Sequence, residues 1–387
     1  MTASEIFVSG GPIFDGHTVH QGAAARFVDG RFDRLVAVGD LPAGATVTDL
    51  DGDILAPGCV DLQVNGGGGL LLNDAPSVDT LSTICAAHRG LGTTRLLPTL
   101  ISDRVEITQA AIAAVTAALG EGVPGVVGLH LEGPHLSLAR KGAHDGAVIR
   151  PMTARDLEML LSAKAAIPVL KVTIAPENVT LAQVAQLSQA GILVSLGHTD
   201  ADYDTCMAYA AAGATCATHL FNAMSQMGNR APGLVGAVLA NAALSAGLIA
   251  DGVHVHPATM RAAWAAKTGP GRIFLVSDAM AVAGTDLSEF TLNDRIIRRE
   301  DGQLRLLDGT LAGADLDLIR AMGVLVSQVG VPLVDALSAA TVVPARLCGL
   351  TRHHLRGPGL PLDQVIRMSR DFGGAQVLAD LVALQAA

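Results

Sequence analysis

Aromatic side chains are scarce: the 387 residues include eight Phe, two Tyr and one Trp. Stacking of a ligand on aromatic rings is therefore not expected to dominate binding. Charged residues are also few, at 16%, and acidic residues exceed basic ones, which gives a net charge of −10. A chain with this balance is not expected to have nucleic acid or an anionic membrane as its main partner.

A disulfide pattern and a membrane-spanning segment are also missing. The five cysteines are scattered, odd in number and form no Cys-x-x-Cys pair, which fits a reducing compartment. The mean hydropathy is +0.43, yet no uninterrupted apolar run reaches the roughly 18 residues of a spanning helix. The first residues lack the basic and apolar regions of a signal peptide. We therefore expect a soluble cytoplasmic protein.

The sequence does contain a repeated alternation of apolar strands and Ala-rich helical stretches. The first fifty-odd residues resemble short strands separated by turn residues, which is typical of a small β-sheet unit. Eight further strands are predicted at residues 60–66, 94–100, 126–133, 169–176, 193–199, 217–223, 244–252 and 272–280. Eight such units favour a (β/α)8 barrel, because a doubly wound sheet would show a phosphate-loop glycine pattern after its first strand.

Polar residues gather where the predicted strands end. They are Gln63 and Asn65, His130 and Glu132, His198, His219, Asp251 and His254, and Asp278. The C-terminal ends of barrel strands meet at one rim, so carboxylates and imidazoles from several strands favour a metal site there. A lone histidine at a strand end is more often a hydrogen-bonding residue. Its repetition on several strands favours metal binding, and we expect His130 to orient Glu132.

A series of motifs carries a family resemblance. They are HLEGP (130–134), KGAHD (141–145), LGHTDADY (196–203), THLFNAM (218–224), PGLVGA (232–237), ADGVHVHP (250–257), SDAM (277–280) and LAGADL (311–316). In this order they resemble the N-acetylglucosamine-6-phosphate deacetylases of the amidohydrolase superfamily. The resemblance implies an α/β fold, with a (β/α)8 TIM barrel over residues 56–349. It also implies a small β-sandwich domain formed by residues 1–55 and 350–387.

The resemblance implies one divalent metal per subunit, held by Glu132, His198 and His219 with water completing the site. Three N/O ligands and an open position describe a catalytic zinc, although Fe2+ or another divalent ion stays open. Many amidohydrolases hold a second metal with a His-x-His pair on strand one. Gln63 and Asn65 occupy those places here, and their neutral amides are expected to contact water or substrate. A chelating pair of His254 and His256 is a further possibility.

Roles in catalysis and substrate binding also follow from the resemblance. Asp278 resembles the general base and acid, and His144 is expected to help stabilise the tetrahedral oxyanion. The implied substrate contacts are Gln63, Asn65, His144, backbone amides around Asn222 and Ala223, Arg230, His254, Ala312 and Gly313. In the family the arginine comes from the neighbouring subunit, which implies a homodimer with shared sites.

The implied reaction is metal-dependent hydrolysis of the acetamide of N-acetyl-D-glucosamine 6-phosphate, in amino-sugar catabolism. A deacetylase for the galacto epimer would keep the same metal site, and the sequence does not decide between them. A cyclic-amide hydrolase is disfavoured because those enzymes usually carry His-x-His and a bridging Lys. A catalytically silent barrel that acts as a binding protein should have lost a ligand or the base, and all of these are present.

Three departures from the family pattern stand out. His135 follows HLEGP, where an aromatic or aliphatic residue is usual. Ala314 and Asp315 replace a small hydroxyl residue, and the segment beyond residue 350 diverges from the usual ending. Within that segment, His353 and His354 are expected to be solvated.

Overall fold

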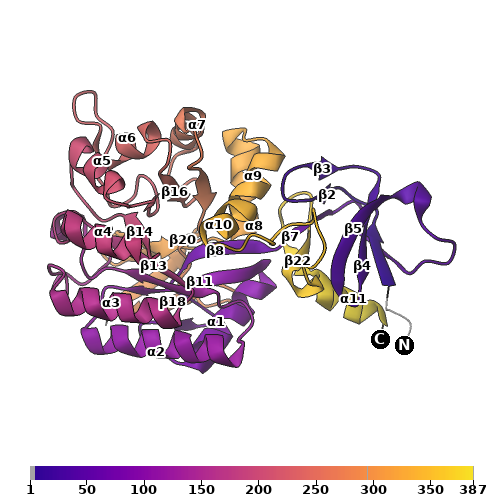
Figure 1. Ribbon diagram of the computed structural model, residues 1–387, viewed down its shortest axis with the longest axis horizontal. Coiled ribbons are helices and arrows are strands. Elements are labelled where there is room, and N and C mark those ends of the chain that lie inside the picture. The colour runs from indigo at the N-terminus through magenta and orange to yellow at the C-terminus, as the bar shows by residue number, and fades with distance from the viewer. Residues whose placement is uncertain (1–4, 294, 387) are drawn as a thin grey trace.

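The structure is a computed structural model that describes residues 5–293 and 295–386. Figure 1 shows a barrel of strands wrapped by helices beside a smaller β-rich domain, from which both ends of the chain emerge. The predicted fold, a (β/α)8 barrel with a small sandwich domain, is confirmed.

Eight parallel strands form the barrel. They are β8 (Cys59–Val64), β11 (Thr93–Ile101), β12 (Gly128–Glu132), β13 (Val169–Ile174), β14 (Leu193–Leu196), β15 (Cys216–Ala217), β16 (Ser245–Leu248) and β17 (Ile273–Leu275). Each overlaps one predicted strand, and they pair in chain order. The ring closes beyond β17, where the Asp278 amide donates to the Gln63 carbonyl at 3.1 Å. The strands are almost entirely buried because helices cover the outside of the barrel and side chains fill its inside.

The barrel helices are α1 (Val78–Gly90), α2 (Val105–Glu121), α3 (Ala154–Ala166), α4 (Leu181–Gln189), α5 (Tyr203–Ala211), α6 (Gly233–Ala240), α7 (Pro257–Ala266), α8 (Leu318–Val324), α9 (Leu333–Ala340) and α10 (Val342–Leu347). Local sequence signals start several of them. Thr153 and Asp156 form a capping box at α3, and Thr180 and Gln183 form another at α4. These side chains satisfy backbone N–H groups that the first helical turn leaves without partners.

Two sheets form the small domain. One contains β1 (Glu5–Ser9), β4 (Ala23–Val28), β5 (Arg31–Ala37) and β6 (Val47–Asp49); the other contains β2 (Ile13–Phe14), β3 (Val19–His20), β7 (Ile54–Pro57), β22 (Val365–Met368) and β23 (Ala375–Val377). Strand β22 lies antiparallel to β7, so the C-terminal segment returns to the N-terminal sheet. Helix α11 (Leu378–Ala386) ends the described chain. The boundaries at residues 55/56 and 349/350 stay a prediction.

An antiparallel sheet that the strand count did not anticipate is inserted after β17. Its strands are β18 (Glu289–Leu292), β19 (Arg295–Glu300), β20 (Gln303–Leu306) and β21 (Leu311–Ala314). A two-stranded hairpin, β9 (Gly66–Gly67) and β10 (Leu70–Leu71), lies after β8. Arg299 donates two hydrogen bonds of 2.8 Å to the Asp315 carboxylate. The aspartate that departs from the family motif therefore links β19 to the segment directly after β21.

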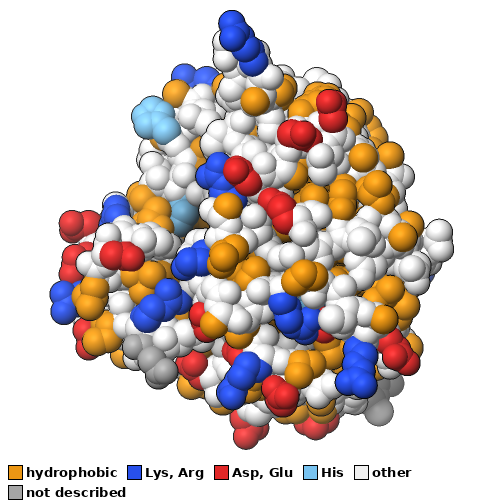
Figure 2. Space-filling view, turned by 90° about the vertical axis from the view of Figure 1, so that its left-hand side faces the viewer, with side chains coloured by type: hydrophobic (Ala, Val, Ile, Leu, Met, Phe, Trp, Pro, Cys, Tyr) orange, Lys and Arg blue, Asp and Glu red, His pale blue; other side chains and the backbone are white. Residues whose placement is uncertain are grey.

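The surface of the barrel that faces away from the small domain carries no large patch of one charge. Figure 2 shows basic and acidic side chains interspersed over it, with apolar side chains between them. None of the helices in the described residues is long and apolar enough to cross a membrane.

His353 is buried, and the expectation that it is solvated is wrong. Only 3% of it is exposed, and its Nε2 lies 2.7 Å from the Gly58 carbonyl oxygen. A carbonyl only accepts, so Nε2 carries the proton. Burial lowers the pKa of His353 from 6.5 to about 4. The folded protein therefore holds this ring neutral at pH values where the unfolded chain protonates it.

This depressed pKa predicts a pH-dependent stability. The contribution is fully present above about pH 6.5 and is lost as the pH falls toward 4, by about 3 kcal/mol. His353→Gln keeps a side-chain N–H for the Gly58 carbonyl and cannot be protonated. Urea unfolding across this pH range should show a smaller loss of stability in the variant than in the wild type. An identical pH dependence in the two proteins contradicts the assignment.

Candidate metal and active site

A cavity of about 410 Å³ opens at the C-terminal ends of the barrel strands. The predicted site residues that line it are Asn65, Glu132, His144, His198, His219, Asn222, Ala223, His254, Asp278, Ala312 and Gly313. Gln63 is fully buried and contacts two of them, as described below. Arg230 is exposed in a loop and does not line the cavity of its own chain. The topology thus brings strand-end residues from across the sequence to one rim.

Three of these side chains form a compact cluster of potential metal ligands. Nε2 of His198 and Nε2 of His219 lie 3.3 and 3.1 Å from Oε1 of Glu132, and 3.0 Å from each other. All three residues are buried. Two imidazole nitrogens and one carboxylate oxygen are a donor set that suits a divalent transition metal.

Hydrogen bonds prepare this cluster for a cation. Nδ1 of His198 lies 2.8 Å from the Arg140 carbonyl oxygen and must donate to it, so Nε2 is the ring nitrogen left to bind a cation. Burial alone would raise the pKa of Glu132. Contacts with His198 and His219 instead hold that pKa well below its usual value, so the carboxylate is charged. The residues present therefore fit a divalent metal.

The backbone at the site is strained. His198, His219 and Asp278 have φ angles of +48°, +28° and +51°, a region that residues other than glycine rarely adopt. Such strain persists only where the surrounding structure enforces it, and it is frequent at functional sites. In this chain the positive φ angles occur just after the ends of β14, β15 and β17, and they turn the three side chains into the cavity.

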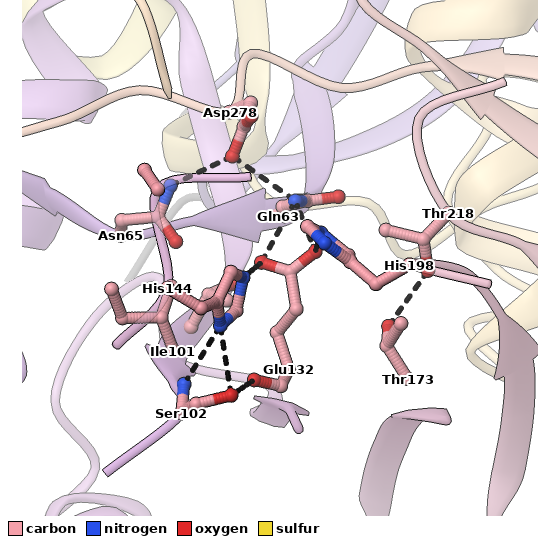
Figure 3. Close-up of polar contacts among 12 residues, drawn as sticks. Gln63, Asn65, Ile101, Ser102, Glu132, His144, Thr173, His198, Thr218 and Asp278 are labelled. Carbon is pink, nitrogen blue, oxygen red and sulfur yellow. Dashed lines mark hydrogen bonds and ion pairs between the residues drawn. The ribbon is translucent and has the colours of Figure 1, made fainter. Parts of the chain in front are cut away.

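Asp278 lies beside the cluster and is held by two amides, as Figure 3 shows. Gln63 and Asn65 donate to its Oδ1 at 3.0 and 2.7 Å. Gln63 Nε2 also lies 3.2 and 3.3 Å from the two carboxylate oxygens of Glu132. Burial first, and the Glu132 charge second, raise the pKa of Asp278. No described residue donates to Oδ2, so that oxygen is available for proton transfer.

His144 presents a proton toward the same cluster. The Ser102 backbone amide donates to Nδ1 of His144 at 3.2 Å, and the Ser102 hydroxyl lies 2.8 Å from the same nitrogen (Figure 3). A backbone N–H can only donate, so Nδ1 is the acceptor and Nε2 carries the hydrogen. Burial lowers the pKa of His144 to about 3, which keeps the ring neutral. Nε2 lies 3.9 Å from Oε2 of Glu132.

The remaining residues of the cavity differ in what they offer. His254 lines it and contacts the Asp251 carboxylate at 2.6 Å through Nδ1. His256, proposed as its chelating partner, does not line the cavity, and its Nδ1 caps α7 by accepting from the Ala258 amide. The Asn222 amide already donates to the His219 carbonyl at 2.9 Å. The expected phosphate contact of the amides around Asn222 and Ala223 stays a prediction; the Ala223 amide has no partner among the described residues.

Fold and site together define the class: a (β/α)8 barrel whose strand ends hold a site for a divalent cation with an aspartate beside it. A model of the amidohydrolase family matches residues 54–353. The chain therefore belongs to the amidohydrolase family.

Named relatives support this. N-acetylgalactosamine-6-phosphate deacetylase of Shewanella sp. (strain ANA-3) is 44% identical over 291 residues, covering 75% of this chain and 73% of the relative. N-acetylglucosamine-6-phosphate deacetylase of Haemophilus influenzae is 35% identical over 321 residues, covering 82% and 83%. The solved N-acetylglucosamine-6-phosphate deacetylase of Pasteurella multocida has a TM-score of 0.90 at 32% identity and covers 96% of this chain and 97% of that chain.

Sequence reasoning missed or misjudged several residues. Ser102 follows β11 directly, so the rule that polar residues matter at strand ends could have found it. The cavity residues Leu292, Thr310 and Leu311 belong to the inserted sheet or its turns and carried no signal. His130 bonds Thr99 and Thr173 through its ring nitrogens, at 3.2 and 2.7 Å, and does not hydrogen-bond Glu132.

The cluster predicts the outcome of removing one ligand. Wild-type protein purified with divalent metal should retain about one ion per chain. His219→Ala should lower the metal affinity by at least about 100-fold, because deleting a ligand costs more than altering its support. Elemental analysis after dialysis checks this, with His353→Gln as a matched control that leaves the metal content unchanged. Full metal retention in His219→Ala contradicts the assignment.

Proposed function

We propose that this chain hydrolyses the acetamide of N-acetyl-D-glucosamine 6-phosphate to D-glucosamine 6-phosphate and acetate. The observation that carries the proposal is the Glu132–His198–His219 cluster with the Asp278 carboxylate beside it, in one cavity. A structure from Mycobacterium smegmatis described as this deacetylase in complex with N-acetyl-D-glucosamine 6-phosphate supports the substrate class. It has a TM-score of 0.87 and 30% identity, and the match covers 97% of each chain.

In this mechanism Glu132, His198 and His219 hold the divalent metal, for which we propose Zn2+. A bound divalent metal lowers the pKa of water and polarises a carbonyl oxygen. Asp278 accepts the proton of the attacking water at Oδ2, while Gln63 and Asn65 hold its Oδ1. The same carboxyl group then gives the proton to the leaving sugar amine.

His144 acts on the oxygen of the reacting carbonyl. Its Nε2–H donates a hydrogen bond to the oxygen on which negative charge develops, which stabilises the transition state more than the substrate. Ser102 takes no part in the chemical step. Its backbone amide donates to Nδ1 of His144 and so keeps the ring proton on Nε2. A neutral donor suits this role, because it needs no protonation at neutral pH.

Arg230, Asn222, Ala223, His254, Ala312 and Gly313 are proposed to bind the sugar phosphate. His254 and Ala223, whose amide has no partner among the described residues, both line the cavity. Arg230 lies outside the cavity of its own chain, which supports its proposed action in a neighbouring subunit of a homodimer. A cytoplasmic location is part of the proposal and is supported by the five cysteines, all of which are free.

The galacto epimer is the second candidate substrate. It is favoured by the relative at 44% identity, which is named as an N-acetylgalactosamine-6-phosphate deacetylase. The two substrates differ in one hydroxyl configuration, so they can share the metal site and Asp278. A comparison of kcat/KM for the two epimers decides which is preferred.

Acetate release from purified protein tests the proposed reaction. Release should require metal, stop on chelation, return on restoring zinc, and be far slower with the unphosphorylated sugar. Asp278→Asn should lower kcat by about 100- to 10,000-fold, the usual contribution of a general acid–base, while elemental analysis finds its metal retained. If metal-loaded wild type releases no acetate from either epimer, the proposed function is wrong.

Arg230 allows a test of the shared site. A charge-assisted hydrogen bond contributes about 1.5–3 kcal/mol, so Arg230→Ala should lower kcat/KM for the phosphorylated sugar by about 10- to 150-fold. Mixing Arg230→Ala with Asp278→Asn and allowing subunits to exchange should restore activity, because one site of the mixed dimer contains both native residues. An equal loss with the unphosphorylated sugar, or no restoration on mixing, counts against the assignment.

A further inference from the structure

A second cavity lies at the other end of the barrel. Its volume is about 410 Å³, equal to that of the candidate active site. It is bounded by α7, α9, α10 and the start of β17, and by Gly16 and His17 of the turn between β2 and β3. Figure 1 shows α7 and α9 at the edge of the barrel, with this turn of the small domain beyond α9. The cavity therefore lies where the two domains meet.

Positive charge dominates the lining of this cavity. Lys267, Arg272 and Arg346 line it, together with His17, and Asp335 is the one carboxylate among the lining residues. The guanidinium groups of Arg272 and Arg346 have no hydrogen-bond or ion-pair partner within the described part of the chain. This concentration of unpaired cations contrasts with the net charge of −10 for the whole chain.

Lys267 is the most informative of these residues. It is only 7% exposed, and its ammonium group donates to the Asn241 carbonyl oxygen at 2.6 Å. Burial first, and the nearby Arg272 charge second, lower the pKa of Lys267. A buried cation that meets another cation and no carboxylate is destabilising unless an anion compensates it. The side chain could have reached solvent, since it ends the exposed C-terminal turn of a surface helix.

We propose that this cavity binds a phosphorylated small molecule, with Lys267, Arg272 and Arg346 around the phosphate. Two guanidinium forks and a compact ammonium group match the several oxygens and double charge of a phosphate better than a single carboxylate. Trp264, the only tryptophan of the chain, lines the same cavity. Its flat apolar ring suits the ring of a sugar or a base attached to that phosphate.

The site is separate from the metal cluster but linked to it through β17. Arg272 precedes this strand of three residues, and Asp278 follows it. An anion at Arg272 would therefore act on the strand that leads to the proposed general base. The proposal does not depend on the proposed function, because its test compares the wild type with a variant that is altered only in this second cavity.

Trp264 provides a local probe, because no other tryptophan contributes to the emission. Excitation at a wavelength that tyrosine does not absorb should show a saturable change in fluorescence on titration with inorganic pyrophosphate. D-glucosamine 6-phosphate and adenosine monophosphate form two further arms, which distinguish a sugar phosphate from a nucleotide as the source of the phosphate. The double variant Arg272→Gln/Arg346→Gln should weaken binding by about tenfold or more. Arg155→Gln, on the exposed surface of α3, is the matched control and should bind as the wild type does.

Calorimetry provides a second measurement in case the fluorescence of Trp264 does not change on binding. Wild type should bind pyrophosphate at one site more per chain than the double variant does, and Trp264→Phe should retain that site. Equal stoichiometry and affinity in wild type and double variant overturn the proposal. The proposed function stands or falls separately, on acetate release.

Discussion

The site depends on one shared hydrogen-bond donor: Nε2 of Gln63 contacts the carboxylates of both Glu132 and Asp278. The two carboxylates carry like charges and repel each other; burial first, and the Glu132 charge second, raise the pKa of Asp278. The amide holds them apart at a defined separation, and a divalent cation between the histidines would compensate their charge. An imidazole in place of Gln63 would itself be a metal ligand. The neutral amide of Gln63 therefore also favours a site with a single metal.

Main-chain groups decide the protonation of the two histidines that face this pair. The Arg140 carbonyl places the proton of His198 on Nδ1 and leaves Nε2 free to bind a cation. The Ser102 amide does the reverse for His144, whose Nε2 becomes a donor. The two imidazole side chains thus take opposite roles, because Nδ1 donates a hydrogen bond in His198 and accepts one in His144. His198, His219 and Asp278 all have positive φ angles, and such strain persists only where the surrounding structure enforces it.

The strand pattern and the motif order were sufficient to predict the barrel, its pairing with a small sandwich, and the clustering of Glu132, His198, His219 and Asp278. Periodicity and strand-end position are local properties, and parallel topology converts them into a common rim. Sequence reasoning did not reveal the inserted sheet β18–β21, whose short strands alternate buried and partly exposed residues instead of forming the fully buried runs of the barrel strands. It also misjudged His353, because the burial of a polar ring depends on the Gly58 carbonyl, which lies far away in the chain.

The sequence by itself therefore determined the fold class and the chemical identity of the side chains at the rim. Only the tertiary structure decided which hydrogen-bond partners those side chains have, that the Asn222 amide is already used, and that Lys267 is buried beside Arg272. The physical reason is that burial and hydrogen bonding are properties of pairs of groups. Lys267 and Gly16 are distant in the chain, and only the docking of the small domain on the barrel brings them to one cavity.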